Sequence, residues 1–323
     1  MKIVKASYIW SHSDYKELLI TKIIESYFDI RLVWTIPAKC DLLLVGPYRP
    51  YKKIKEKWLT PKNKKIKNIF SDLEKGLFLR KHKPLTIFYS RENERIFDLS
   101  EDFKIGTDYN YANNEDYLRI PVWKDFIDWS HLGLSTSPLD TMNAIRFGSH
   151  YNLSDLMKPQ GTDFLKKNRS ICGFFSYLWE PRKSLISKIK KQFPFKGYGK
   201  AFDGNIINHN QSSFAKKDIL KNYFANFCPE NSLYPGWYTE KVPDAFLSKS
   251  LPITWSDQNI RNDFNPNSFI NLNNYDEYQI TSLLEEIKDD HYLLKFCKEP
   301  LLLTEPDLNA EISFAKKIIN NFI

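Results

Sequence analysis

Short apolar segments alternate with amphipathic segments along the chain, and this alternation is the feature that most constrains its fold. A first strand is expected at 2–10. The runs at 30–34, 41–46 and 84–90 are short, apolar and bounded by Pro or Gly, as expected for buried strands. Between them, residues 14–28 place apolar side chains at helical spacing, and a further helix is expected near 70–82. Strand–helix–strand order predicts parallel βαβ units with right-handed crossovers.

The same pattern restarts after about residue 160. A strand is expected within 170–178, and a helix follows it with Pro181 at its first position, where proline costs little. Further strands are expected at 195–199, 224–228, 251–255 and 268–273, and one long helix is expected over roughly 276–298. A last helix is expected to begin at Asp307.

These two blocks define the predicted fold class, an α/β protein with two domains. A chain of 323 residues exceeds the size at which one core keeps growing, so two domains are expected. We predict two Rossmann-like domains facing a cleft, spanning 1–158 and 159–323. Ligands of such sheets bind beyond the carboxyl ends of the strands.

Composition limits the classes of function. The net charge of +8 favours anionic partners, such as nucleotides, nucleic acid or an acidic membrane face. Four widely spaced cysteines without a CxxC pair, and six histidines without HExxH spacing, predict no metal site and no disulfide scaffold. No apolar run reaches 18 residues and the N-terminus does not read as a signal peptide, so a cytoplasmic protein is expected. The Lys-rich run at 51–67 is a solvated surface, a peripheral membrane contact or a patch on the acceptor side.

The richest stretch for chemistry is "CPENSLYPGWYTEKVPDAFLSKSLPITW", residues 228–255. If a strand precedes it, Thr239 is a suitable N-cap for a helix that carries Glu240 and Lys241 in its first turn. The positive end of that helix and the Lys241 ammonium would then form an anion site. Glu240 cannot bind phosphate, so its carboxylate better suits a ribose diol. The alternative from these residues alone is an ordinary capped helix with a surface lysine.

The same stretch resembles the signature of the α1,3/4-fucosyltransferase family of bacterial type. That signature has an ENS triplet, a short loop, an aromatic residue, TEK, an apolar helix and a Pro-Ile strand. A second block, "IFYSRENERIFDLSEDFKIGTDYNYANNEDYLRIPVW" (87–123), is similar to the family's Glu-Asn, D-x-x-IG-x-D and Y-x-R-x-P succession. Residues 264–277 are similar to the stretch that follows the signature, so the resemblance covers roughly 87–277.

The resemblance implies the GT-B fold and an inverting transfer of fucose from GDP-fucose that requires no metal or other cofactor. The first domain would then bind the acceptor glycan, and the second domain, with the C-terminal helix, would bind the GDP-sugar. Without a metal, protein charges must stabilise the leaving diphosphate. The bacterial members imply an acceptor of the N-acetyllactosamine type on lipopolysaccharide, fucosylated at GlcNAc in α1,3 linkage.

Donor-site residues follow from the resemblance one by one. Lys241 matches the lysine that contacts the donor phosphate, and Glu240 matches the carboxylate associated with the ribose. Asn231 lies in the ENS triplet and would meet fucose hydroxyls. Arg182 matches an arginine that binds diphosphate, a role that suits a permanently charged guanidinium.

The sequence departs from the family pattern inside the signature. Trp237 stands where the family usually has Tyr, and its indole N–H can donate to phosphate although it lacks a hydroxyl. Tyr238, one residue on, is the other candidate for that contact. Pro229 replaces an aromatic residue before the triplet. These departures leave open which sugar the site accepts.

The catalytic base is expected to be a carboxylate in the first domain. Glu92, at a predicted strand end, matches the family's proposed base, and Glu94 is the second choice. A base in this position would take the proton from the acceptor hydroxyl.

Two alternatives to a fucosyltransferase remain at this point. One is a transferase of the same fold that uses another GDP-sugar. The other is a protein without this catalysis, which binds glycans or nucleic acid. The charge of +8 and the 15% of aromatic residues suit nucleic acid, but no recognisable nucleic-acid-binding module is present, so nucleic acid is not an expected partner.

Overall fold

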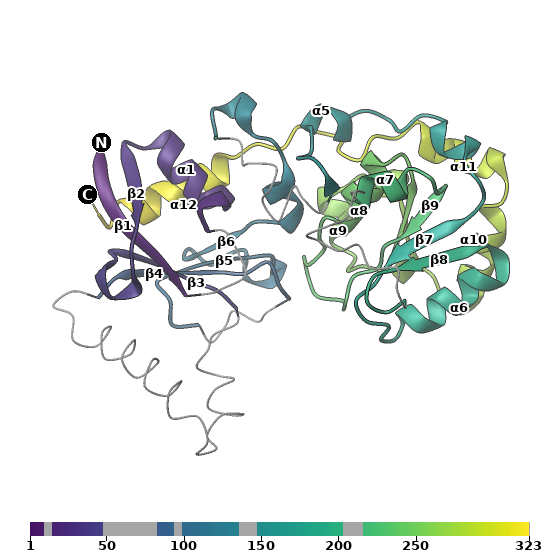
Figure 1. The fold of residues 1–323 in the computed structure, drawn as a ribbon, viewed down its shortest axis with the longest axis horizontal. Helices are drawn as coiled ribbons and strands as arrows, with labels where there is room; N and C mark the ends of the chain where they lie inside the picture. The colour runs from purple at the N-terminus through teal and green to yellow at the C-terminus, as the bar shows by residue number, and fades with distance from the viewer. Residues whose placement is uncertain (10–14, 48–82, 94–98, 136–146, 203–215, 323) are drawn as a thin grey trace, which may run out of the picture. The chain divides into compact units, whose positions relative to one another are not determined.

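The computed structural model describes most of the chain, and Figure 1 shows its ribbon. The described residues are 1–9, 15–47, 83–93, 99–135, 147–202 and 216–322. Three features expected from the sequence lie outside them: the helix near 70–82, the Lys-rich run at 51–67, and Glu94.

The chain divides into two compact units. Unit 1 comprises Met1–Ile120, Leu132–Ser135 and Asp307–Ile323, and unit 2 comprises Pro121–His131 and Thr136–Pro306. The predicted division at residue 158 differs from this one in two ways: unit 2 already begins at Pro121, and the C-terminal helix belongs to unit 1.

Unit 1 is built on a parallel sheet in the order β2-β1-β3-β4-β5-β6. Its strands are β1 (Lys2–Ile9), β2 (Ile30–Trp34), β3 (Leu42–Val45), β4 (Leu85–Tyr89), β5 (Phe103–Gly106) and β6 (Tyr117–Arg119). The first four confirm the predicted strands, whereas β5 and β6 were not predicted. Both are short and lie inside a polar segment, so their apolar pattern is weak.

Helix α1 (Leu19–Tyr27) confirms the helical spacing of 14–28. Helix α12 (Asn309–Ile319) packs against it, although the two are almost 300 residues apart in the chain. The ring of Phe314 in α12 also meets that of Phe103 in β5, edge to face, with 5.5 Å between centroids. Figure 1 shows α12, in yellow, beside α1, in purple.

Unit 2 contains a second parallel sheet, in the order β11-β10-β9-β7-β8. Its strands are β7 (Ile171–Phe174), β8 (Phe195–Tyr198), β9 (Ala225–Phe227), β10 (Leu251–Thr254) and β11 (Ile270–Asn271). Its helices are α5 (Leu153–Leu156), α6 (Arg182–Gln192), α7 (Lys216–Leu220), α8 (Lys241–Leu247), α9 (Ile260–Asp263), α10 (Glu277–Glu286) and α11 (Asp290–Cys297).

The core of unit 2 lies between its sheet and the apolar faces of α6, α10 and α11. Ile189 of α6, Ile287 after α10 and Phe227 of β9 are all fully buried in it. Helix α8 packs on β10 instead and contacts α5 and α7. The loops that leave the carboxyl ends of β7 and β9 lead into α6 and α8, respectively.

The single helix expected over 276–298 is wrong: the structure divides it into α10 and α11. Asp289 is the reason for the break, because its side chain accepts from the backbone N–H of His291 at 2.9 Å and so begins a new helix. Asp276 starts α10 with a reciprocal capping box to Gln279. Among the described residues, no helix has both the length and the apolar character needed to cross a bilayer.

Candidate functional site

The predicted donor residues of unit 2 gather beyond the carboxyl ends of β7 and β9. After β9 ends at Phe227, the chain stays hydrogen-bonded to the β10 side: the N–H of Cys228 donates to Ile253, and that of Glu230 donates to the Trp255 carbonyl at 3.0 Å. Glu230 is thereby held at the edge of the sheet where ligands of parallel sheets bind. Arg182 arrives at the same edge as the first residue of α6.

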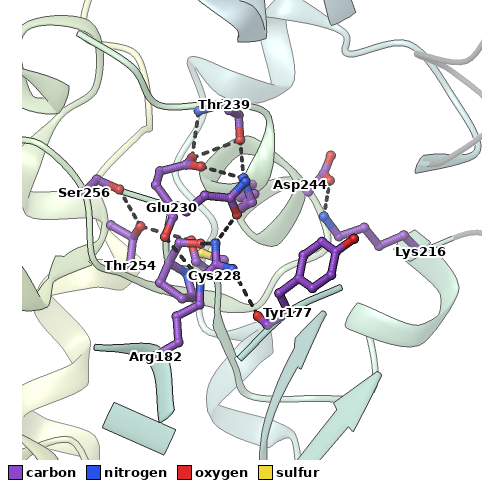
Figure 2. Close-up of polar contacts among 12 residues, drawn as sticks. Tyr177, Arg182, Lys216, Cys228, Glu230, Thr239, Asp244, Thr254 and Ser256 are labelled. Atoms are coloured by element: carbon purple, nitrogen blue, oxygen red, sulfur yellow. Dashed lines mark hydrogen bonds and ion pairs between the residues drawn. The ribbon is translucent and has the colours of Figure 1, made fainter. Parts of the chain in front are cut away.

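Glu230 is the centre of this cluster, and its side chain is only 1% exposed. One carboxylate oxygen accepts from the backbone N–H of Thr239 at 2.8 Å and from the Thr239 hydroxyl at 2.9 Å. The other accepts from the Lys241 ammonium at 2.5 Å. Figure 2 shows these contacts converging on the Glu230 carboxylate. A buried carboxylate is tolerated here because a charge and two hydrogen bonds compensate its lost hydration.

Lys241 is fixed from two sides. Its ammonium donates to Glu230 and, at 2.8 Å, to the Thr239 hydroxyl, and it lies 5.9 Å from the centre of the Trp237 ring. The Lys241 side chain is 21% exposed. A lysine has three N–H donors, so one remains for a ligand after these two contacts.

Arg182 is 5% exposed and braces the turn that carries the ENS triplet. Its Nε donates to the Glu230 carbonyl at 3.2 Å, its Nη2 to the Pro229 carbonyl at 3.3 Å and to Asn231 Oδ1, and its Nη1 to the Tyr177 carbonyl at 3.2 Å. These contacts use four of the five guanidinium donors, which leaves one Nη1–H. Burial lowers the pKa of Arg182 and the Glu230 charge opposes this, so the group stays charged at neutral pH.

Taken together, Arg182, Glu230 and Lys241 carry one net positive charge. Two donors, one on each cation, have no partner among the residues that the structure describes. Asn231 is exposed beside them and is tied to Arg182 through its side-chain oxygen. Such an arrangement suits a bound anion with several oxygens. Across the described ranges, no group of three or more His, Cys, Asp or Glu side chains could hold a metal ion.

The predicted N-cap of α8 is wrong by one residue. The helix begins at Lys241, its N-cap is Glu240, and no side chain caps it. The Thr239 hydroxyl does not cap because Glu230 and Lys241 offer it charged partners. Glu240 is half-buried, and its carbonyl accepts from the Asp244 N–H at 2.9 Å. With only seven residues, α8 adds a small dipole, and the cations carry the charge of the site.

A buried polar group fixes the first turn of α8. The Tyr151 hydroxyl donates to Asp244 at 2.5 Å and also to the Glu240 carbonyl at 3.3 Å, while the Lys216 ammonium lies 2.6 Å from the second Asp244 oxygen. Burial raises the pKa of Asp244, opposed by the Lys216 charge, and burial together with Asp244 raises the pKa of Tyr151. This group sets where Glu240 and Lys241 stand.

Lys167 holds the other end of α8. Its ammonium donates to the Ser248 carbonyl at 3.0 Å and also to the Lys249 carbonyl. These carbonyls follow the last helical residue and have no partner within the helix, so a lysine there completes the helix end.

The two aromatic residues of the signature differ in what they can contact. Tyr238 is 1% exposed; its hydroxyl donates to the Asn259 carbonyl at 3.1 Å and its ring packs near Phe264. The structure therefore places Tyr238 in the support of the loop and not on the cluster. Trp237 is also buried, but Lys241 lies over its ring. Trp237 is thus the aromatic residue of the pair that contacts the cluster.

Glu92, the expected base, belongs to unit 1. It lies three residues beyond β4 and is half-buried, and its backbone N–H donates to the Ser90 hydroxyl at 3.0 Å. Ser90 is itself hydrogen-bonded to Ile105 of β5, so Glu92 leaves the sheet at its carboxyl edge. The structure describes Glu92 and the cation cluster each within its own unit.

Sequence reasoning missed the residue on which the cluster depends. Glu230 was part of the ENS triplet but received no role, and neither did Tyr151, Asp244 or Lys216. The available signal was a carboxylate directly after a strand, with a Thr and a Lys nine and eleven residues later.

Replacing Glu230 by Gln tests the central ion pair. The amide can still accept from Thr239 but leaves the Lys241 charge without its partner, so the free energy of unfolding is expected to fall by about 3 kcal/mol. Urea denaturation measures it. Asp218→Asn is the matched control, because it breaks the exposed Lys221–Asp218 pair and should cost less than about 1 kcal/mol. Equal losses in the two variants would contradict the central role of Glu230.

Lys167 gives the structure a distinct pH dependence. Burial lowers its pKa to about 8 from the ordinary 10.5. Between these values the unfolded chain holds a proton that the folded chain lacks, so the free energy of unfolding rises with pH across this window. Lys167→Met should remove that rise, and Lys166→Met, at an exposed neighbour, should keep it. Denaturation at pH values below and within the window measures the free energy of unfolding of each variant. The same dependence of this free energy on pH in both variants would refute the assignment to Lys167.

Comparison with known proteins finds similarity to fucosyltransferases. Residues 164–297 match the model of the glycosyltransferase family 10 (fucosyltransferase) C-terminal domain. An alpha-(1,3)-fucosyltransferase of Helicobacter pylori is 28% identical over 209 residues, which cover 59% of this chain and 41% of that protein. The chain spans less than half the length of the curated relatives it matches.

Solved structures resemble the whole chain. A crystal structure of an alpha1,3-fucosyltransferase gives a TM-score of 0.67 at 20% identity and covers 100% of this chain and 91% of that one. The structure of an alpha1,3-fucosyltransferase with GDP-fucose gives 0.66 at 20% identity, covering 100% and 92%. The predicted GT-B class, with its parallel sheets, is thereby confirmed. The sequence signature and the family match together show that the chain is similar to the C-terminal domain of glycosyltransferase family 10, the fucosyltransferases, over residues 164–297.

Proposed function

We propose that the chain is an inverting fucosyltransferase that moves L-fucose from GDP-fucose to a hydroxyl of an acceptor glycan. The observation that carries the proposal is the Arg182–Glu230–Lys241 cluster, in which Lys241 is held by the buried Glu230 carboxylate and Arg182 by the backbone carbonyl of the same residue. The family match supports fucose as the transferred sugar. The acceptor we propose is GlcNAc of an N-acetyllactosamine-type lipopolysaccharide, in α1,3 linkage, as the bacterial resemblance implies.

The donor diphosphate would lie against the two cations. Lys241 offers its third N–H and Arg182 its fifth, and a diphosphate has oxygens enough to accept from both. A solved alpha1,3-fucosyltransferase with GDP-fucose supports this class of donor. Glu240 would accept from the ribose, Asn231 would meet fucose hydroxyls, and Trp237 would contribute its ring face beside Lys241.

In the proposed reaction, Glu92 takes the proton from the acceptor hydroxyl as that oxygen attacks the anomeric carbon of fucose. The bond from this carbon to the diphosphate oxygen breaks on the opposite face, which inverts the configuration through an oxocarbenium-like state. GDP leaves with the electron pair, and Arg182 and Lys241 stabilise its negative charge. In this proposal no metal takes part, because the protein cations supply the charge.

The proposed place of action is the cytoplasm, with peripheral contact at the inner face of the membrane. The Lys-rich run at 51–67 motivates the contact, since a basic segment is attracted to anionic lipids.

The direct test uses purified protein with a panel of GDP-sugars and terminal disaccharides, with products identified by mass spectrometry. GDP-fucose with an N-acetyllactosamine acceptor is expected to give a product one deoxyhexose heavier. Lys241→Ala should weaken GDP binding in calorimetry by about tenfold or more, because a charged hydrogen bond is lost. Lys288→Ala, which removes an exposed lysine, is the matched control. Transfer from another GDP-sugar alone would refute the donor assignment, and absence of any GDP binding would refute the proposal.

Glu92→Gln separates catalysis from donor binding. Loss of the base should lower kcat by about 10²- to 10⁴-fold, while GDP affinity stays unchanged because Glu92 belongs to unit 1. Initial-rate kinetics together with calorimetry measure both quantities. Turnover close to that of the wild type would exclude Glu92 as the base.

A further inference from the structure

Two aromatic rings stand exposed beside the cation cluster. The Tyr177 and Trp179 rings stack on each other with 5.0 Å between centroids and 9° between planes, and the residues are 56% and 61% exposed. Exposed apolar area of this kind costs free energy in water. A stacked, solvent-facing pair in the loop between β7 and α6 therefore calls for a binding role.

The loop that carries the pair is anchored on both sides. Before it, Phe175 is buried, and its N–H donates to the Tyr198 carbonyl at 2.8 Å. After it, the Glu180 carboxylate accepts from the N–H of Ser184 at 3.2 Å and from its hydroxyl at 2.5 Å. The rings are thus held in place before any ligand arrives, which reduces the entropy lost on binding.

The pair is connected directly to the cluster. The Tyr177 carbonyl accepts from Arg182 Nη1 at 3.2 Å. Figure 2 shows this contact, with the Tyr177 ring extending away from the Arg182 guanidinium. A ligand held by Arg182 would therefore have this aromatic surface as its neighbour.

The order of the strands indicates which part of a ligand reaches the rings. Tyr177 and Arg182 follow β7, whereas Glu240 lies in the connection from β9 to β10, on the other side along the sheet order. With the ribose at Glu240 and the diphosphate at Arg182 and Lys241, the nucleoside lies toward β10. The opposite end of the donor, its sugar, then points toward the side of β7.

From this placement we infer that Tyr177 and Trp179 form a stacking surface for a pyranose ring. A pyranose has faces lined by C–H groups, whose hydrogens carry a slight positive charge, and aromatic faces are negative. The inference rests on the proposed function. The pyranose is either the fucose of the donor or the acceptor sugar it joins, and both share the chemistry that the rings recognise. The guanine base is disfavoured because the ribose carboxylate lies on the other side of the cluster.

Trp179→Ala tests the surface, with calorimetry of GDP and of GDP-fucose and with the KM for the acceptor. The GDP affinity is expected to stay that of the wild type. Either the GDP-fucose affinity falls about tenfold, which assigns the donor fucose, or the acceptor KM rises about tenfold, which assigns the acceptor. Trp179→Phe should keep most of the wild-type GDP-fucose affinity and acceptor KM, because an aromatic ring remains. Tyr278→Ala is the matched control, because Tyr278 is 89% exposed on α10.

Other outcomes overturn the inference. Equal losses of GDP and GDP-fucose affinity would place the nucleoside on the rings. If both affinities and the acceptor KM stay unchanged, the rings bind no sugar. A loss confined to sedimentation with anionic vesicles would assign them to a membrane. Thermal unfolding verifies that each variant is folded. If the wild type binds no GDP, the proposed function fails as well; if it binds GDP and Trp179→Ala changes nothing, this inference alone fails.

Discussion

The arrangement of unit 2 depends on one buried carboxylate. Glu230 joins the end of β9 to the start of α8, because its backbone pairs with the β10 side and its side chain holds Thr239 and Lys241. The Glu230 carbonyl also accepts a hydrogen bond from Arg182, so the loops after β7 and β9 share one anchor. A carboxylate with so many donors has little freedom. The two cations are consequently spaced by the protein itself before any anion binds, which is the preorganisation that a charged leaving group requires.

Helix α8 also depends on contacts from residues outside it. Tyr151, Asp244 and Lys216 fix its beginning, and Lys167 fixes its end. A helix of seven residues is not stable by itself, so tertiary contacts must hold it. The signature lysine keeps its place because residues far away in the sequence define the axis of the helix that carries it.

Much of this architecture was accessible from the sequence. Periodicity predicted β1 to β4 and the strands of unit 2, since buried strands with turn residues at their ends give a strong local signal. The family resemblance identified Arg182, Asn231 and Lys241, which the structure brings together. Other features depend on partners that no local pattern reveals. Glu230 has its role because its carboxylate accepts from Thr239, nine residues later. The Tyr238 hydroxyl donates to the Asn259 carbonyl, 21 residues away. The break at Asp289 depends on its side-chain contact to the His291 N–H.

The packing of α12 on α1 has a consequence for how the chain is made. The strands of unit 1 are synthesised before unit 2, yet α12, which also belongs to unit 1, follows nearly all of unit 2 in the chain. Until residues 309–319 have been synthesised, the face of α1 that they cover stays open to water. Unit 2 can thus complete its core before unit 1 does. During that time unit 1 exposes an apolar surface on α1, and surfaces of this kind are bound by chaperones.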